Sequence, residues 1–228
     1  MPEYGQAFAL WREAACQSDT DIWHAYTCHP FVKGLQEGTL PPESYLRYLK
    51  QDYLFLLHFS RAWALAVVKS ETLDEMKFAS ATVDALVNLE MQHHVDICAS
   101  YGIEEQTLLE TEESAATIAY TRYVLDAGLS GDLLDLLAAL APCIFGYGEI
   151  GRRLGKGLST ENPYAEWIET YAGTAYQKVC HEVGLLIDEA LIRRVGRDFP
   201  LSPRWERLTH RFVTASKLEV DFWGMALQ

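Results

Sequence analysis

The chain has 228 residues, of which 49% are hydrophobic and 22% charged, a composition typical of a globular protein with a sizeable core and not of a disordered one. Its 32 acidic and 19 basic residues give a net charge of −13. Because that charge repels nucleic acid and anionic lipid, we expect neither as a partner.

The N-terminal stretch "MPEYGQAFALW" has no basic segment followed by an apolar one, so the sequence predicts no secretory signal. The longest uncharged runs, such as Leu136 to Gly148, are shorter than the about 20 residues that span a bilayer. The five cysteines are widely spaced and fit neither a disulfide framework nor a CxxC metal pair. We therefore expect a cytoplasmic protein with reduced thiols and no membrane partner.

Apolar residues recur at helical spacing along almost the whole chain, whereas no strand-like alternation persists. Glycines, prolines and capping residues divide this pattern into helices. In chain order we expect helices over 3–17, from a cap at Asp19 or Thr20 to about Thr27, from Pro30 onward, and over 41–70, 72–101, 111–127, 131–157, 163–171, 174–195 and 203–226. The middle of 41–70 is apolar on nearly every side, so that helix should lie centrally. With no internal repeat and no long linker, the chain is predicted to be one all-α domain over residues 1–228.

The stretch "APCIFGYGEIG", residues 141–151, contains a match to G-x-G-x-x-G. A dinucleotide-binding loop of this kind needs a strand before the first glycine and a helix that begins at the last. The preceding "DLLDLLAALAPCIF" has helical spacing instead. We therefore interpret Gly146, Gly148 and Gly151 as places where a neighbouring helix or a ligand approaches the backbone closely. Pro142 predicts either a kink within a helix or a break between two short helices.

Three of the expected helices carry pairs of chemically useful side chains at helical spacing. The pairs are Asp52 with Phe55, Cys143 with Tyr147, and Glu219 with Phe222. Asp52 lies in the most apolar helix, where an ionised carboxylate is costly unless it is paired or hydrogen-bonded to a ligand. Each pair alone is explained by packing or by a partly exposed acid. Together they predict the lining of one pocket.

The stretch from Glu90 to His93 has the Glu-x-x-His spacing that di-iron bundles use twice, so a metal site is one interpretation of it. A second copy is missing, since Glu149 has no histidine three residues later. His93 and His94 are consecutive and point in different directions on a helix. We expect no metal, and we expect His94 to be structural or to support a site residue.

The chain resembles the TenA family, also called thiaminase II or aminopyrimidine aminohydrolase, which has the heme-oxygenase-like helical fold. The resemblance covers nearly the whole length and includes "HPFVKGLQEGTLPPESYLRYLKQDYLFL", "NLEMQHH", "APCIFGYGEIG", "NPYAEWIETYAG" and "FVTASKLEVDFWGMA". Its signatures P-C-x-x-x-Y, W-I-x-x-Y and S-x-x-E-x-x-F-W are fairly specific as a set. The cysteine in the first of them places the chain in the cysteine-bearing branch.

The resemblance implies a role for each matching position. Cys143 matches the cysteine that adds to the pyrimidine ring, and Glu219 matches the carboxyl group that exchanges a proton with a ring nitrogen, with Tyr171 beside it. Asp52 matches the carboxylate that holds the ring amino group. The matching pocket residues are Tyr120, Tyr147 and the ring-packing Phe222. This set supplies an activated thiol, an acid in an apolar setting and a group that fixes the substrate.

One position departs from the family pattern: Phe55 stands where a tyrosine is expected one helical turn after the pocket aspartate. The missing hydroxyl bears on the leaving group and on whether thiamin itself is cleaved. The resemblance implies a hydrolase of thiamin salvage that converts 4-amino-5-aminomethyl-2-methylpyrimidine, or a relative, to the hydroxymethyl pyrimidine and ammonia. It implies a homotetramer and no cofactor. The alternatives are a metal-dependent oxidase of the same fold and a non-catalytic pyrimidine-binding or regulatory protein.

Overall fold

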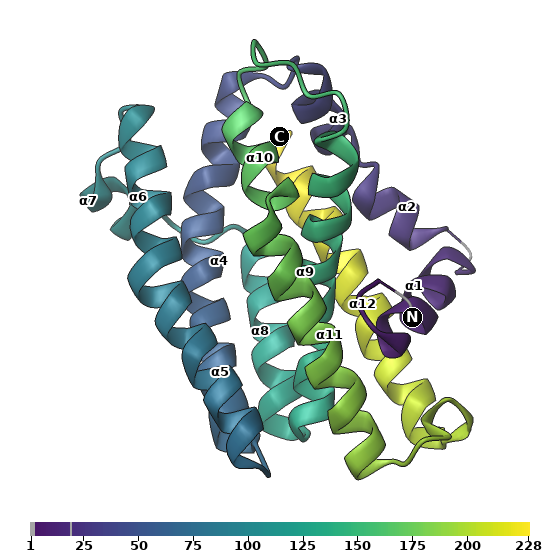
Figure 1. Cartoon of the computed structure of the whole chain (residues 1–228). Helices are drawn as coiled ribbons and strands as arrows, with labels where there is room; N and C mark the ends of the chain where they lie inside the picture. The colour runs from purple at the N-terminus through teal and green to yellow at the C-terminus, as the bar shows by residue number, and fades with distance from the viewer. Residues whose placement is uncertain (1–2, 19) are drawn as a thin grey trace. The chain divides into compact units, whose positions relative to one another are not determined.

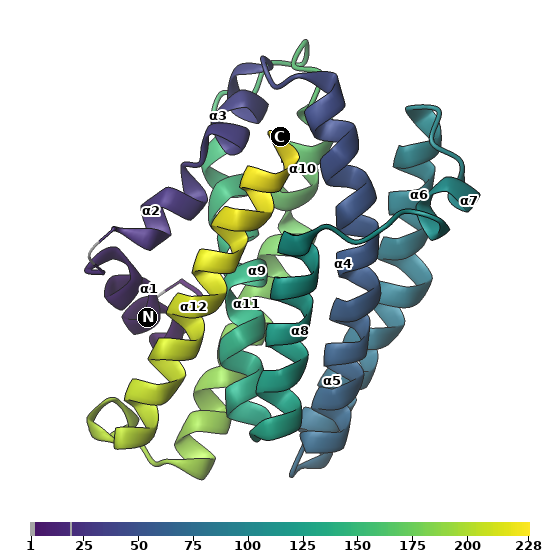
Figure 2. The same cartoon turned by 180° about the vertical axis from the view of Figure 1, so that it is seen from behind.

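The computed structural model describes residues 3–18 and 20–228, and every regular element in that part of the chain is a helix (Figures 1 and 2). The α-helices are α1 (Gln6–Cys16), α2 (Ile22–Thr27), α3 (Pro30–Glu37), α4 (Pro42–Lys69), α5 (Leu73–Ala85), α6 (Met91–Ser100), α7 (Glu105–Leu109), α8 (Ala115–Ser130), α9 (Leu133–Leu154), α10 (Ala165–Ala172), α11 (Thr174–Arg194) and α12 (Pro203–Ala226). The predicted all-α class is therefore confirmed.

Two short helices of other types complete the order: the π-helix η1 (Leu86–Glu90) and the 3₁₀-helix η2 (Phe199–Leu201). The expected helix over 72–101 is in fact α5, η1 and α6 in succession, and α7 and η2 were not predicted. The N-cap of α2 is Asp21, whose side chain accepts a hydrogen bond from the backbone N–H of His24. The predicted cap at Thr20 is thus wrong, and Asp19 lies outside the described residues.

The contacts divide the chain into two compact units. The first unit consists of Met1–Leu40 and Leu137–Trp223, and the second of Pro41–Leu136 and Gly224–Gln228. Each is described by itself below. The organisation of residues 1–228 as a single domain stays a prediction.

The first unit has a core of stacked aromatic rings. The ring centroids of Phe8 and Phe145 are 4.4 Å apart, and those of Trp23 and Phe212 are 5.5 Å apart. The Asp188 carboxylate on α11 accepts hydrogen bonds of 2.7 and 2.8 Å from the first two backbone N–H groups of α1. Because the first N–H groups of a helix have no partner inside it, this contact attaches α1 to α11.

Helix α9 carries the stretch with the three spaced glycines and runs without interruption through Pro142, so the predicted break between two helices is wrong. The hydroxyl of Tyr26 donates to the carbonyl oxygen of Pro142 at 3.3 Å. A β-carbon at Gly146 would collide with the Tyr26 ring, and one at Gly148 would lie 2.6 Å from the sulfur of Cys180. The interpretation of these glycines as close-packing positions is confirmed.

Among the described helices, α9 is also long and apolar enough to cross a membrane by length and composition. The sequence expectation rested on the uncharged run alone, which is shorter than the whole helix. However, 89% of the apolar window of α9 is buried inside the protein. Buried core helices pass the same test, so α9 is weak evidence for a membrane span.

In the second unit α4 packs against α5 and α8, and in both views α5 runs alongside α4 (Figures 1 and 2). The buried side chain of Gln51 on α4 connects to the start of α8. Its amide nitrogen donates to the carbonyl of Glu112 at 2.9 Å, and its oxygen accepts from the backbone N–H of Ser114 at 2.9 Å and from the hydroxyl of Thr117 at 2.6 Å. These bonds hold the N-terminal turn of α8 against the middle of α4.

Candidate active site

The predicted site residues occur in both units. Those of the first unit are Cys143, Tyr147, Tyr171, Glu219 and Phe222, and those of the second unit are Asp52, Phe55 and Tyr120.

In the first unit the structure gathers four aromatic side chains from α9, α10 and α12. Tyr147 has ring centroids 4.9 Å from Tyr171, 5.3 Å from Trp223 and 5.9 Å from Trp167. Trp167 in turn lies 4.7 Å from Tyr171. The rings meet at tilted or edge-to-face angles and bring together aromatic groups of the kind that a planar aromatic ligand packs against. We name Tyr147, Trp167, Tyr171 and Trp223 the aromatic cluster.

Tyr171 is held in the aromatic cluster by its backbone. The side-chain amide of Gln177 donates to the carbonyl oxygens of Tyr171 at 2.8 Å and of Gly148 at 2.9 Å. Gly151 lies directly against the same residue, because a β-carbon there would collide with the backbone and Cβ of Tyr171. The absence of a side chain at Gly151 thus sets how closely α10 approaches α9.

We expect Gly151→Ala to lower both stability and activity, since the added methyl group must push Tyr171 away from α9. Overpacking of this kind costs about 1–3 kcal/mol. Gly224 is the matched control, because a β-carbon there meets nothing within 4 Å. Gly224→Ala should leave stability equal or raise it by up to about 1 kcal/mol. Chemical denaturation checks both, and equal stability of the two variants would contradict the packing role of Gly151.

Cys143 and Glu219 lie on two of the helices that build the aromatic cluster. Cys143 is half-buried on α9, one turn before Tyr147. Glu219 is 1% exposed on α12, four residues before Trp223, and Phe222 is equally buried. An ionised carboxylate is costly in the protein interior, so a buried glutamate indicates a function more than a contribution to solubility.

In the second unit Asp52 is buried on α4 among other polar groups. The hydroxyl of Tyr48 donates to Oδ2 of Asp52 at 3.2 Å, and Nδ1 of His94 lies 3.6 Å from the same oxygen. Burial raises the pKa of Asp52 to about 7, and the hydrogen bond from Tyr48 opposes that rise. The carboxyl group therefore changes protonation state near neutral pH.

Phe55 follows Asp52 by three residues and packs against α8. Its ring centroid lies 5.0 Å from Tyr120 and 5.6 Å from Phe59. Tyr120 is buried three residues after Thr117, which the Gln51 contact fixes. The structure thus brings Phe55 and Tyr120 together in the second unit, with Phe55 one helical turn after Asp52.

Sequence reasoning assigned no role to Tyr48 or Trp167, and it expected Trp223 only as part of the apolar surroundings of Glu219. Tyr48 lies four residues before Asp52, so its spacing to that unusual acid was an available signal. The two tryptophans stand inside the quoted signatures, but only the packing of α10 and α12 shows that they flank Tyr147. His94 was expected to be structural or to support a site residue, and it does contact Asp52.

Within the described part of the chain, no three His, Cys, Asp or Glu side chains gather as they would around a metal ion. His93 of the Glu-x-x-His motif is exposed. Glu90 of the same motif is also exposed. Burial and then the charge of Asp52 raise the pKa of its carboxyl group to about 7.

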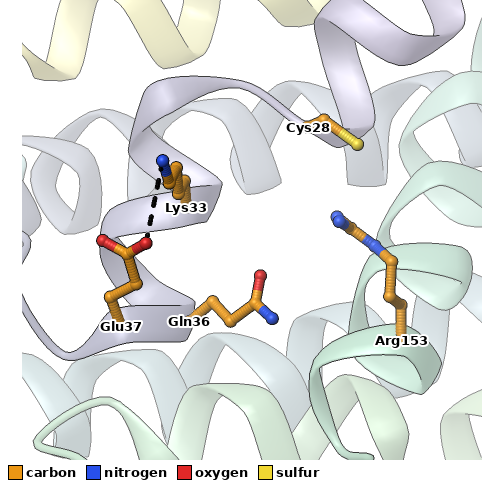
Figure 3. A pocket seen from close by; sticks show the side chains of 5 residues that line it. All are labelled: Cys28, Lys33, Gln36, Glu37 and Arg153. Atoms are coloured by element: carbon orange, nitrogen blue, oxygen red, sulfur yellow. Dashed lines mark ion pairs between the residues drawn. The ribbon is translucent and has the colours of Figure 1, made fainter.

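The first unit has a cavity of about 390 Å³. None of the predicted site residues of that unit lines it. Its lining residues are Cys28, Lys33, Gln36, Glu37 and Arg153, and Figure 3 shows Arg153 and Gln36 directed into it. Lys33 pairs with Glu37 at 3.7 Å, and Arg153 donates to the carbonyl of Thr27. No aromatic ring is among these lining residues, so this cavity lacks the stacking partners that suit a planar aromatic ligand.

Comparison with known proteins decides the family. The family model described as TENA/THI-4/PQQC matches residues 17–228, which include segments of both units. The chain belongs to this family. The TenA resemblance found in the sequence is therefore confirmed.

This TenA family member is similar to the following three proteins in sequence or in structure. A protein of Halalkalibacterium halodurans named aminopyrimidine aminohydrolase is 36% identical over 208 residues, which cover 90% of each chain. A crystal structure from Silicibacter sp. TM1040, described as a TenA family transcription regulator, is 57% identical with a TM-score of 0.95 and covers 99% of this chain and 98% of that one. A domain of unknown function from Shewanella denitrificans with a heme oxygenase-like fold is 14% identical, with a TM-score of 0.68 and coverage of 97% and 88%. The predicted heme-oxygenase-like fold is thus confirmed.

Proposed function

We propose that this TenA family member is an aminopyrimidine aminohydrolase of thiamin salvage. The relative from Halalkalibacterium halodurans, at 36% identity, bears the name of this activity. The observation that carries the proposal is the aromatic cluster, which is built on the three signatures and includes Tyr147, one turn after the Cys143 thiol. A flat ligand ring and a nearby thiol are what addition to a pyrimidine requires.

In the proposed reaction each site residue has one task. The thiolate of Cys143 forms a bond to a ring carbon while Glu219, with Tyr171 beside it, gives a proton to a ring nitrogen. Asp52 accepts a hydrogen bond from the ring amino group. The rings of Phe55, Tyr120, Tyr147 and Phe222 hold the pyrimidine by packing.

The order of steps follows from the loss of aromaticity. Addition of the thiolate and protonation of the nitrogen make the ring a non-aromatic enamine, whose electrons expel the protonated aminomethyl nitrogen as ammonia. Water then adds to the exocyclic methylene and loses one proton to solvent. Departure of the thiolate, with return of the ring-nitrogen proton to Glu219, restores aromaticity. The balance is one aminomethyl pyrimidine and one water consumed, and one hydroxymethyl pyrimidine and one ammonia formed. No redox step and no cofactor takes part.

The setting that fits this chemistry is the cytoplasm, with a small pyrimidine as the partner and no nucleic acid or membrane. A homotetramer is the assembly that we propose. The net charge of −13 supports the absence of a nucleic-acid partner. Sedimentation of the purified protein measures the assembly, and a monomer at working concentration would contradict the proposed tetramer.

The experiment that tests the function is ammonia release from 4-amino-5-aminomethyl-2-methylpyrimidine by the purified protein, with calorimetry of the hydroxymethyl product run in parallel. Turnover together with binding supports the hydrolase. Binding without turnover would instead favour a regulatory protein, a second candidate that the description of the Silicibacter relative supports. Absence of both would contradict any role toward this pyrimidine.

We expect Phe55→Tyr to change the preference of the enzyme between leaving groups and to leave the fold intact. The added hydroxyl brings a new hydrogen-bond donor to an apolar position, where the ring centroid of Phe55 lies 5.0 Å from that of Tyr120. One such bond is worth about 1 kcal/mol, or a factor of about five. The ratio of thiamin cleavage to aminomethyl pyrimidine hydrolysis should therefore shift by roughly that factor, and an unchanged ratio would show that Phe55 does not set substrate choice.

A further inference from the structure

His94 is a buried residue of α6 whose imidazole contacts α4 at two points. Nε2 lies 2.7 Å from the backbone carbonyl oxygen of Leu49, and Nδ1 lies 3.6 Å from Oδ2 of Asp52. Because a carbonyl oxygen has no hydrogen to donate, Nε2 must carry the hydrogen of the first contact. This requirement fixes the tautomer, so neutral His94 directs its bare nitrogen, Nδ1, at Asp52.

A bare Nδ1 and an ionised carboxylate present two acceptors to each other. Both residues are buried, with 7% of His94 and 6% of Asp52 exposed, so water does not separate them freely. One hydrogen between Nδ1 and Oδ2 turns this repulsion into attraction and shortens the contact. Tyr48 cannot supply that hydrogen, because its hydroxyl already donates to Oδ2 at 3.2 Å.

We propose that Asp52 and His94 bind one proton as a pair, held between Oδ2 and Nδ1, so that Oδ1 of Asp52 remains a hydrogen-bond acceptor in both protonation states. Oδ1 accepts no hydrogen bond from the residues that the structure describes. A ring amino group can only donate, so it needs such an acceptor. His94 is then a positioning residue that acts through Asp52. This inference rests on the proposed function for its ligand.

The protonation tendencies of the two side chains agree with this arrangement. Burial raises the pKa of Asp52 to about 7 and lowers the pKa of His94 from its usual value. The proton therefore belongs to Oδ2 of Asp52, and His94 accepts from it. Without Nδ1 to accept it, and with Tyr48 donating to Oδ2, the hydrogen of the protonated carboxyl group would lie on Oδ1, where it would meet the hydrogen of the ligand amino group.

Other titratable groups surround the pair and have to be separated from it. They are Tyr48 and Tyr53 on α4, Glu90 on η1, and His93 and Cys98 on α6. Burial, and then the charge of Asp52, raise the pKa of Cys98 to about 12, so this thiol stays neutral. Glu90 is the group that titrates in the same range as Asp52. Glu90→Gln is accordingly the control.

The test is calorimetric binding of 4-amino-5-hydroxymethyl-2-methylpyrimidine at about pH 6 and about pH 8.5. His94→Gln keeps a donor for Leu49 but removes Nδ1, whereas His94→Asn keeps a polar group at the Nδ1 position. Affinities are compared with wild type at the same pH, which corrects for titration of the ligand ring. His94→Gln should lose about tenfold in affinity at the lower pH only. The factor follows because a carboxyl group with a pKa near 7 is protonated in a ratio of about ten to one at about pH 6. His94→Asn and Glu90→Gln should follow the wild type.

Equal loss at both pH values in His94→Gln would make His94 a merely structural residue and overturn the proposal. If wild type itself does not bind the pyrimidine, the proposed function fails, and the pair is judged by long-range ¹H–¹⁵N NMR of His94. The proposal requires a hydrogen on Nε2 throughout and an Nδ1 signal that stops titrating in Asp52→Asn. A hydrogen on Nδ1 of the neutral ring would overturn it.

Discussion

Cys143→Ser is expected to lower the rate of ammonia release by about a thousandfold or more while the protein still binds the hydroxymethyl pyrimidine. The hydroxyl group is a far weaker nucleophile than a thiolate, and loss of a covalent nucleophile removes the step that breaks the aromaticity of the ring. The change is small in volume and Cys143 is half-buried, so the free energy of unfolding should change by less than about 1 kcal/mol.

Cys28→Ser is the matched control for this variant. Cys28 is also a half-buried cysteine of the first unit, but it borders the polar cavity instead of the aromatic cluster. Its replacement should leave ammonia release unchanged. If Cys143→Ser retains wild-type rates, or if both variants lose activity equally, the thiol of Cys143 does not act as the nucleophile.

Asp52→Asn is expected to lower activity by about a hundredfold and, at the same time, to stabilise the protein above neutral pH. The activity falls because the asparagine amide can present its NH₂ group where the ring amino group needs an acceptor. The expected loss in rate is comparable to that from removing one positioned hydrogen-bonding group in an active site. The gain in stability has a different origin, namely the cost of ionising a buried carboxyl group.

The direction of the stability change follows from the raised pKa. Folded Asp52 has a pKa of about 7, against an ordinary value of 3.8 for an aspartate, so the folded state binds more protons than the unfolded state between these values. The free energy of unfolding therefore falls as the pH rises from about 4 to about 7 and is constant above that. Asp52→Asn should keep only the part of this fall that Glu90 contributes, and at pH 8 it should be more stable than wild type by a few kcal/mol at most.

Urea denaturation at about pH 5 and about pH 8 measures this difference, with Glu90→Gln as the control for the neighbouring carboxyl group. Equal stability of wild type and Asp52→Asn at the higher pH would show that Asp52 is not strained by burial. Lost activity together with gained stability is the result expected if Asp52 serves the function of the protein at the expense of its stability.

Much of the fold was predictable because the helices have local boundary signals. Pro203 opens α12 and Pro30 opens α3, each at the first turn, where proline is tolerated. The π-helix η1 was not predictable, since its i→i+5 bonds leave the apolar spacing of 72–101 almost unchanged. The five residues of α7 are too few to show a periodicity, and the chain there reads as polar loop.

The candidate site was predictable to the extent that single residues were conspicuous. Asp52 stood out as an acid in an apolar helix, and the structure confirms that it is buried. The contacts of Asp52 with His94, and of Gly151 with Tyr171, join segments far apart in the chain, so no spacing rule reports them. For the same reason the sequence could suggest a shared pocket but not which aromatic rings touch.

The most direct test of the proposed hydrolysis is product analysis in water enriched in ¹⁸O. Purified protein is given 4-amino-5-aminomethyl-2-methylpyrimidine, and ammonia and the hydroxymethyl pyrimidine are quantified together by mass spectrometry. We predict equal amounts of the two products and one solvent oxygen in each hydroxymethyl group. A pyrimidine product without solvent oxygen, or no ammonia above that of the buffer, would contradict the account.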